Sequence, residues 1–189
     1  MKKCLLVSSV LLVAIVGSAC NSATDVLTSQ ETVPVNEKAI EAVEVDMMNT
    51  EGNKVGTAML SETPKGVVIH LMAEGLEPGE KAIHFHETGK CEKPDFKTAG
   101  AHFNPEHKEH GFENPKGFHA GDLPNLEIPE NGIVDFELTV KTVTLKQGEK
   151  NSLLDEDGSA LVIHAGPDDY KTDPAGNAGD RMVCGVIQH

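Results

Sequence analysis

The sequence predicts an all-β domain, an antiparallel sandwich or barrel, and three observations support this prediction. Short runs of alternating apolar and polar residues recur along the chain and are bounded by glycine and proline, as strands joined by turns are. The domain shows no convincing helical period. Two stretches, 87–131 and 165–180, are rich in Gly, Pro, Asp and Asn. We predict that they are loops, and loops this long in a compact domain are usually functional.

The N-terminus has the features of a targeting segment. Lys2 and Lys3 precede a short apolar run, which is the charged and apolar pair of regions found in secretory signals. The run is shorter than the roughly 20 residues of a membrane span. It ends in small residues before Cys20, as in a bacterial lipoprotein box, although Gly17 stands where Leu or Val is usual. We therefore expect a signal peptide over residues 1–19.

The fate of Cys20 determines where the protein is found. If Cys91 and Cys184 pair in an oxidising compartment, Cys20 is an odd thiol unless it is acylated. We expect an extracytoplasmic lipoprotein held at the membrane by a lipid at Cys20, or a secreted protein if the ordinary signal peptidase cuts instead. Residues 20–37 are polar without a hydrophobic period, so they predict a disordered tether ahead of a domain over residues 38–189.

The predicted strands follow the tether in order. Each is a short run rich in Val, Ile, Leu or Met, and glycine or Thr63-Pro64 breaks the runs apart. The cluster at 75–79 is a predicted turn. The strands are expected at 39–47, 55–60, 66–72, 82–86, 132–145, 160–164 and 182–187.

Length and charge limit the classes of function. The 189 residues suffice for one domain of ordinary size, and the formal net charge is −14. Loss of residues 1–19, whose only charges are Lys2 and Lys3, would bring it to −16. So acidic a chain argues against nucleic-acid binding, whose electrostatic footprint is basic. It would also repel an anionic substrate unless a local positive field overcomes the net charge.

Histidines cluster in a way that indicates metal binding. Six of the nine histidines fall between residues 84 and 122, and a seventh, His164, ends an apolar run. Neutral imidazole is the commonest metal ligand in proteins. Because residues i and i+2 of a strand point to one face, His84 and His86 project together, while Phe85 faces the core.

Two ligand groups can be assembled from these residues. An all-nitrogen group suits Cu(II), and its members are His84, His86, His102 and His164. Three imidazoles and a carboxylate suit a structural Zn²⁺, and its members are His102, His110, His119 and Asp122. Spacing alone leaves open whether His102 belongs to both groups, and whether His107 or His110 completes the second.

The pattern as a whole resembles the copper–zinc superoxide dismutase family over about residues 38–189. Four motifs carry the resemblance: His-Phe-His-Glu at 84–87, Ala-Gly-Ala-His-Phe-Asn-Pro at 99–105, His-Ala-Gly-Asp-Leu at 119–123 and Gly-Asn-Ala-Gly-Asp-Arg-Met-Val-Cys-Gly-Val-Ile at 176–187. The resemblance implies an immunoglobulin-like Greek-key β-sandwich or barrel with two long functional loops. It also implies one copper and one zinc per chain, and superoxide as the substrate.

The resemblance assigns a role to each residue. It makes His84, His86 and His164 copper ligands, His102 the bridge between copper and zinc, and His110, His119 and Asp122 the remaining zinc ligands. It makes Arg181 the residue that guides superoxide and Asp168 the carboxylate linking a copper histidine to a zinc histidine. It pairs Cys91 with Cys184. His70, His107 and His189 match no ligand position. Apart from the resemblance, we expect Lys171 to add positive charge near the site.

Other functions use the same residues differently. A copper-binding or copper-buffering protein on this scaffold would bind metal without turnover. A metallohydrolase is disfavoured because the chain has no His-Glu-x-x-His and a closed zinc group leaves no position for water. Both a homodimer and a monomer are compatible with the family resemblance.

Overall fold

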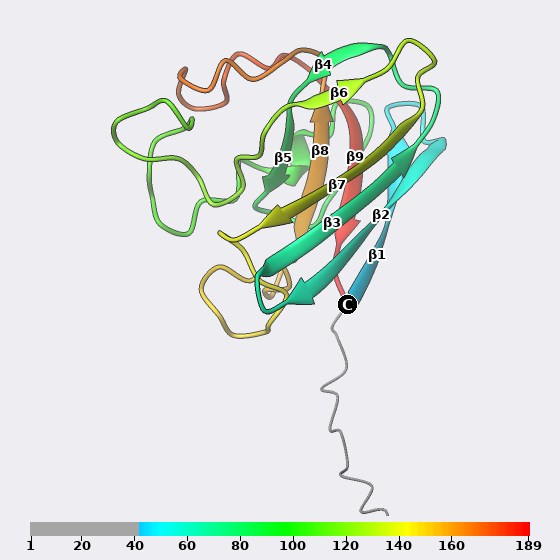
Figure 1. The fold of residues 1–189 in the computed structure, drawn as a ribbon. Coiled ribbons are helices and arrows are strands. Elements are labelled where there is room, and N and C mark those ends of the chain that lie inside the picture. Colours follow the sequence, from blue (N-terminus) through cyan, green and yellow to red (C-terminus); the bar gives the residue numbers. More distant parts are fainter. Residues whose placement is uncertain (1–41) are drawn as a thin grey trace, which may run out of the picture. The chain divides into compact units, whose positions relative to one another are not determined.

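The computed structural model describes residues 42–189, and its main element is a curled antiparallel sheet (Figure 1). The strand order in this seven-stranded sheet is β5-β8-β9-β1-β2-β3-β7. The strands are β1 (Ala42–Asn49), β2 (Lys54–Thr63), β3 (Gly66–Ala73), β5 (Ile83–His86), β7 (Val134–Val140), β8 (Ser159–His164) and β9 (Arg181–Ile187). The predicted all-β class is confirmed. The predicted signal peptide, Cys20 and tether lie outside the described residues.

The alternation that predicted strands also builds the core. In β3, Val67, Ile69 and Leu71 are fully buried, while His70 and Met72, which follow Ile69 and Leu71, face outward. The inward side chains of β1, β2, β7, β8 and β9 pack into the same apolar cluster. Because side chains alternate across a strand, each strand of the curled sheet contributes every second residue to this cluster.

β5 and β8 differ from the other strands because both of their faces are buried. Phe85 and Leu161 are partners in the register of the two strands and face the apolar cluster. His84 and His86 alternate with Phe85, and they are also buried. The segments 87–125 and 165–180 form loops on the side of the sheet that carries β5 and β8 (green and orange in Figure 1). The metal-type residues thus lie between the sheet and these loops.

The structure corrects the predicted elements in two places. A pair of three-residue strands was not predicted: β4 (Gly79–Lys81) begins at the last residue of the predicted turn, and β6 (Leu126–Ile128) lies within the predicted loop, as does one short 3₁₀ helix, η1 (Lys97–Ala99). The strand predicted at 132–145 ends at Val140, because Thr144 pairs with Ser152 of the following loop instead of with β3. Among the described residues, no helix is long and apolar enough to cross a membrane.

Candidate metal centre

The first ligand group lies on the outer face of β5 and β8. Its ring nitrogens, one from each residue, lie within 4.8 Å of one another, and all four residues are buried: His84, His86, His102 and His164. β5 supplies the first two from adjacent same-face positions, as predicted, and β8 supplies His164. His102 comes from the loop, held by a backbone bridge to His86.

Hydrogen bonds fix which nitrogens of this group are free. His86 Nδ1 lies 3.0 Å from the carbonyl oxygen of Gly100, and His164 Nδ1 lies 3.3 Å from that of Gly179. A carbonyl only accepts, so each Nδ1 carries the proton and each Nε2 presents a lone pair. His84 Nδ1 and His102 Nε2 are buried without a hydrogen-bond partner. The group therefore offers four nitrogen lone pairs, a set that fits copper.

The second group converges on one carboxylate. The Nδ1 atoms of His102, His110 and His119 lie 2.8, 3.0 and 3.2 Å from the same oxygen, Oδ1 of Asp122. All four side chains are buried. Three imidazoles and a carboxylate gathered this closely fit a tetrahedral zinc ion. His102 belongs to both groups, one ring nitrogen to each, and His110 instead of the exposed His107 completes the second.

Burial and neighbouring charges set the protonation of these histidines. Burial lowers the pKa of His102 to about 4 and that of His164, with help from His84, to about 3. These rings are neutral near pH 7, as metal ligands must be. Burial opposes a proton on His110 too, but hydrogen bonds to Asp122 and Asp168 outweigh it and raise the pKa of His110 to about 9. A zinc ion in the second group would displace that proton.

Asp168 joins the two groups. Its Oδ2 lies 2.8 Å from Nε2 of His84, and its Oδ1 lies 3.0 Å from Nε2 of His110. Burial alone would raise the pKa of this carboxyl, but the bonds to His110 and His84 hold it well below its usual range. Asp168 thus accepts from one histidine of each group, as a carboxylate that orients metal ligands does.

Arg181 sits at the edge of the first group. Its two terminal nitrogens each donate over 2.7 Å, one to the carbonyl of Phe96 and one to that of Gly100. Gly100 is also the acceptor for His86, so one carbonyl serves both residues. Arg181 lines a cavity of about 470 Å³ together with Lys97, Asp95 and Asp180, and Lys97 and Asp95 pair with each other at 2.6 Å. Lys171 is exposed and pairs with Glu113 at 2.7 Å, and it does not line this cavity; its contribution to the field stays a prediction.

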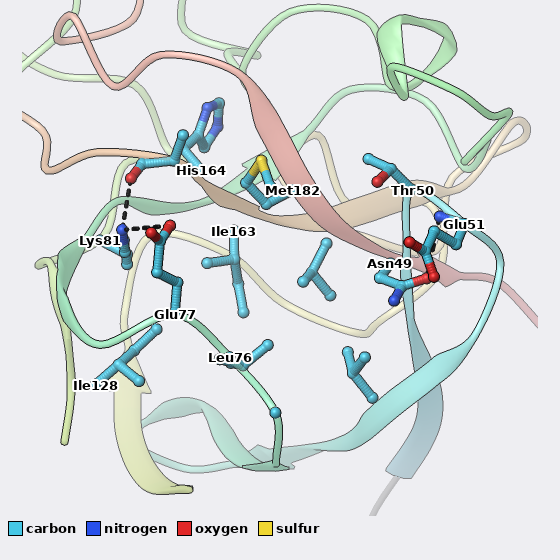
Figure 2. A pocket seen from close by; sticks show the side chains of 14 residues that line it. Asn49, Thr50, Glu51, Leu76, Glu77, Lys81, Ile128, Ile163, His164 and Met182 are labelled. Carbon is cyan, nitrogen blue, oxygen red and sulfur yellow. Dashed lines mark hydrogen bonds and ion pairs between the residues drawn. The ribbon is translucent and has the colours of Figure 1, made fainter. Parts of the chain in front are cut away.

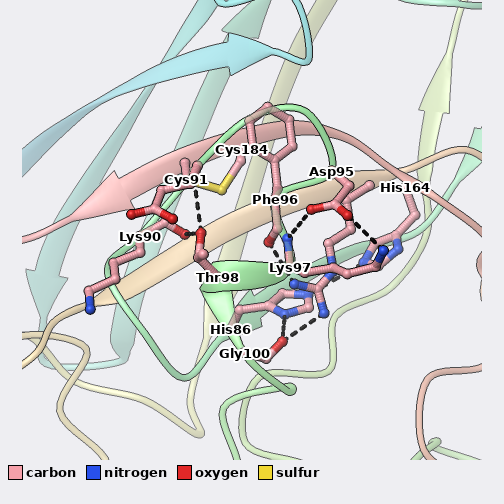
Figure 3. Close-up of a disulfide and its surroundings, with 12 residues drawn as sticks. His86, Lys90, Cys91, Asp95, Phe96, Lys97, Thr98, Gly100, His164 and Cys184 are labelled. Atoms are coloured by element: carbon pink, nitrogen blue, oxygen red, sulfur yellow. Dashed lines mark hydrogen bonds and ion pairs between the residues drawn. A yellow bond between two sulfur atoms is a disulfide. The ribbon is translucent and has the colours of Figure 1, made fainter.

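The predicted disulfide is confirmed, and it fixes the segment that holds Arg181. Cys91 and Cys184 are bonded across 93 positions, with their Cα atoms 5.7 Å apart (Figure 3). Cys184 lies on β9, three residues after Arg181, and Cys91 opens the segment that carries Phe96 and Gly100. The bond therefore links the guanidinium group to its two acceptors through a short covalent path.

A second cavity borders the centre from another side (Figure 2). It has a volume of about 260 Å³, and apolar side chains such as Leu76, Ile163 and Met182 line much of it. Lys81 closes one side by donating to the carbonyl of Ala165 over 2.7 Å. Among the two ligand groups only His164 reaches this cavity, so it does not open onto the other ligands.

Sequence reasoning missed residues that act through Asp168. The side chain of Asn125 bonds the backbone of Asp168 twice, and Gly176 has φ +64 with an added Cβ falling 1.9 Å from Asp168 Oδ1. Gly176 begins the motif at 176–187, and Asn125 follows the motif at 119–123. Nothing in the sequence around either residue indicates that it contacts Asp168. His70 and His189 lie outside both groups, as expected.

An all-β domain with two buried ligand groups that share one histidine ring defines a class of protein with paired metal sites. The family model for copper/zinc superoxide dismutase matches residues 54–187, and the chain belongs to this family. It is 56% identical over 144 residues to a Cu-Zn superoxide dismutase of Aquifex aeolicus, covering 76% of this chain and 84% of that one. It is 49% identical over 145 residues to the superoxide dismutase-like protein YojM of Bacillus subtilis, covering 76% and 74%.

Solved structures agree with this membership and confirm the predicted fold. A double mutant of a SOD-like protein from Bacillus subtilis, in which a tyrosine and a proline are replaced by histidine, superposes with a TM-score of 0.76 at 49% identity. The match covers 77% of this chain and 97% of that one. The Cu/Zn superoxide dismutase from Brucella abortus gives a TM-score of 0.64 at 32% identity, covering 78% and 99%.

Proposed function

We propose that this protein dismutates superoxide, converting two superoxide ions and two protons into dioxygen and hydrogen peroxide. It uses one copper and one zinc ion per chain. The observation that carries the proposal is the shared ring of His102, whose Nε2 belongs to an all-nitrogen group and whose Nδ1 belongs to a group with a carboxylate. Copper, when bound, supplies the redox chemistry, because it cycles between Cu(II) and Cu(I), whereas zinc has no redox chemistry.

The ligand assignment follows from the donor sets. We assign copper to the all-nitrogen group, His84, His86, His102 and His164, and zinc to the group with a carboxylate, His102, His110, His119 and Asp122. The unpartnered buried nitrogens of His84 and His102 support this assignment, because a buried polar atom without a partner costs free energy that a metal would recover.

His102 is the residue that we assign to proton transfer. Its Nδ1 is engaged with Asp122, so its Nε2 is the ring atom that can take up a proton and release it toward the product. The contact with Asp122 keeps the ring in one orientation while the proton moves. Asp168 holds His84 and His110 in fixed tautomers from behind, since its carboxylate accepts from both.

Arg181 provides the local positive charge that an acidic chain otherwise lacks. Two of its five N–H groups bond to the carbonyls of Phe96 and Gly100, and the side chain lines the cavity of about 470 Å³. The remaining donors are available to an anion in that cavity. The same cavity is lined by Asp180 and by Asp95, which pairs with Lys97 at 2.6 Å, so the field that attracts superoxide to a protein of net charge −14 comes from Arg181 together with the bound copper and zinc ions.

We also propose an extracytoplasmic location with a lipid anchor at Cys20. The signal-like segment at residues 1–19 supports this proposal, and so does the disulfide, because such bonds persist in oxidising compartments. Mass spectrometry of the N-terminal fragment from the producing cell tests it, since an acylated Cys20 gives a defined added mass. A free N-terminus beyond Cys20 would instead indicate secretion. Sedimentation of the metal-loaded protein distinguishes a homodimer from a monomer.

Superoxide consumption by the full chain loaded with copper and zinc tests the enzymatic proposal. Fast turnover should require copper and fall sharply in His102→Ala. The matched control is His70→Ala, because His70 contacts Asp135 on the outer face of the sheet and belongs to neither group. Tight metal binding without turnover in the unmutated protein would reject the enzyme in favour of a copper-buffering protein.

A further inference from the structure

Tyr170 connects the two loops that cover the metal centre. Its hydroxyl accepts the backbone N–H of Asn125 over 2.7 Å, and its own N–H donates to Oδ1 of Asp168 over 2.6 Å. Its carbonyl accepts the N–H of Glu113 over 3.0 Å, and its ring lies 5.6 Å from that of Phe112. One residue of the 165–180 loop thus holds the 87–125 loop at three places.

Asn125 closes this network on Asp168. Its Oδ1 accepts the N–H of Asp168 over 2.9 Å, and its Nδ2 donates to the carbonyl of Asp168 over 3.0 Å. The backbone of Asp168 is therefore clamped by a side chain whose own backbone is held by the Tyr170 hydroxyl. The carboxylate of Asp168 then reaches His110 on one side and His84 on the other.

The backbone of Tyr170 is held in an unfavourable conformation. Its φ is +62, in the left-handed region, which bulky side chains rarely adopt. Such a conformation persists only where surrounding contacts over-determine it, and it is concentrated at functional sites. The four contacts of Tyr170 satisfy that condition, and they fix its N–H against the same oxygen of Asp168 that His110 uses.

We propose that Tyr170 is a positioning residue for the Asp168 carboxylate, through which zinc bound at His110 changes the environment of His84. The hydroxyl is the essential group. Without it the N–H of Asn125 loses its acceptor, the Asn125 side chain shifts, and the clamp on Asp168 loosens. This inference rests on the proposed function, which makes His110 a zinc ligand and His84 a copper ligand.

The chain offers a direct optical readout of this connection. Tyr170 is its single tyrosine and there is no tryptophan, so tyrosine emission from the full chain reports on this residue alone. Titrating zinc into the metal-free, disulfide-intact protein should change that emission and saturate at one equivalent. Zinc is not paramagnetic and has no redox chemistry, so the change reports structure at Tyr170.

Two variants separate the hydroxyl from the packing of the ring. Tyr170→Phe should weaken zinc binding several-fold in a chelator competition, less than the roughly 10- to 100-fold that loss of an outer partner of a metal ligand costs, because the variant keeps the Asp168 carboxylate that contacts His110. The Cu(II) electron paramagnetic resonance spectrum of its copper–zinc form should shift toward that of the zinc-free protein. Phe112→Leu is the matched control: it changes the neighbouring ring and keeps the hydroxyl, so zinc affinity should stay unchanged.

The outcomes distinguish this inference from the proposed function. No zinc binding by the unmutated protein would overturn the ligand assignment and this inference with it. Tight zinc binding with no change in tyrosine emission would overturn the inference alone, and that holds even if Tyr170→Phe fails to fold. Unchanged zinc affinity in Tyr170→Phe, or an equal loss in Phe112→Leu, would also overturn it.

Discussion

Replacing Cys91 and Cys184 together by alanine should lower stability and, independently, slow turnover. The bond joins positions 93 apart, and closing a loop of that length is worth about 4.7 kcal/mol in the chain-entropy model. For a domain of this size, each kcal/mol corresponds to roughly 2–4 °C in Tm. The variant should therefore melt roughly 9–19 °C lower. Alanine suits this test because Cys184 lies among apolar side chains such as Phe96 and Val162.

The effect on rate has a different origin. Without the bond, the segment that carries the carbonyls of Phe96 and Gly100 is no longer tied to the strand that carries Arg181. A displacement of about 1 Å in a residue that positions substrate can cost up to about 100-fold in rate. We expect turnover per bound copper ion to fall about tenfold or more, with the largest loss at low superoxide concentration.

Two measurements and one control separate these effects. Denaturant unfolding gives the free energy, and pulse radiolysis gives the rate, normalised to bound copper. Leu60→Ala is the control, because Leu60 is fully buried on β2 and its truncation costs about 2.7–5 kcal/mol without touching the loop. It should lose similar stability and retain the rate per copper. A stability loss below about 1 kcal/mol would refute the loop-entropy reasoning. A rate equal to that of Leu60→Ala would refute the positioning of Arg181.

Three further outcomes follow from the structure. Gly176→Ala places a Cβ 1.9 Å from Asp168 Oδ1 and should weaken zinc binding about tenfold or more in a chelator competition. Gly75→Ala is the control, because Gly75 has a similar φ with open space around it, and it should leave zinc affinity unchanged. Glu62 is desolvated by burial, but hydrogen bonds from Leu145 and Thr144 lower its pKa below the ordinary 4.5. Its stabilisation is thus present above that value and lost as pH falls through the folded pKa. Glu62→Gln should therefore cost about 1–2 kcal/mol in urea unfolding at pH 7, and the cost should shrink as the pH falls below 4.5. Removing zinc with a chelator should lower the Tm of the protein in a calorimetric scan, because a ligand at about 100 times its Kd stabilises the folded state by about 2.7 kcal/mol. An unchanged Tm would contradict zinc binding to the folded state.

Local alternation was enough to predict the long strands but not the short ones. β3 was predicted to within one residue because four inward apolar side chains alternate with outward ones. β4 and β6 each have three residues, too few for a period to appear, and they exist because each pairs with the other across the chain. Val143 and Leu145 alternate one residue out of phase with β7 and are buried, yet their backbone belongs to a loop. Burial there comes from packing, and sequence periodicity cannot separate it from strand pairing.

The metal ligands divide in the same way. Strand geometry alone brought His84 and His86 to one face. His102 and His110 lie on a loop whose path is set by tertiary contacts. Residue type made them candidate ligands, but only the family resemblance indicated that His102 belongs to both groups and that His110, not His107, completes the second. Asn125 escaped notice because its two bonds to Asp168 span 43 positions and follow no local pattern.

The carbonyl of Gly100 shows why this centre needs its loops held so firmly. It accepts from Nδ1 of His86, which leaves Nε2 of that ring free to bind metal, and it accepts from Arg181, which places the positive charge beside the same group. One backbone oxygen therefore sets both the tautomer of His86 and the position of the charge that we propose attracts superoxide. Any motion of Gly100 changes both together, and the disulfide restrains that motion from β9. The covalent bond thus serves the geometry of the reaction as well as the stability of the fold.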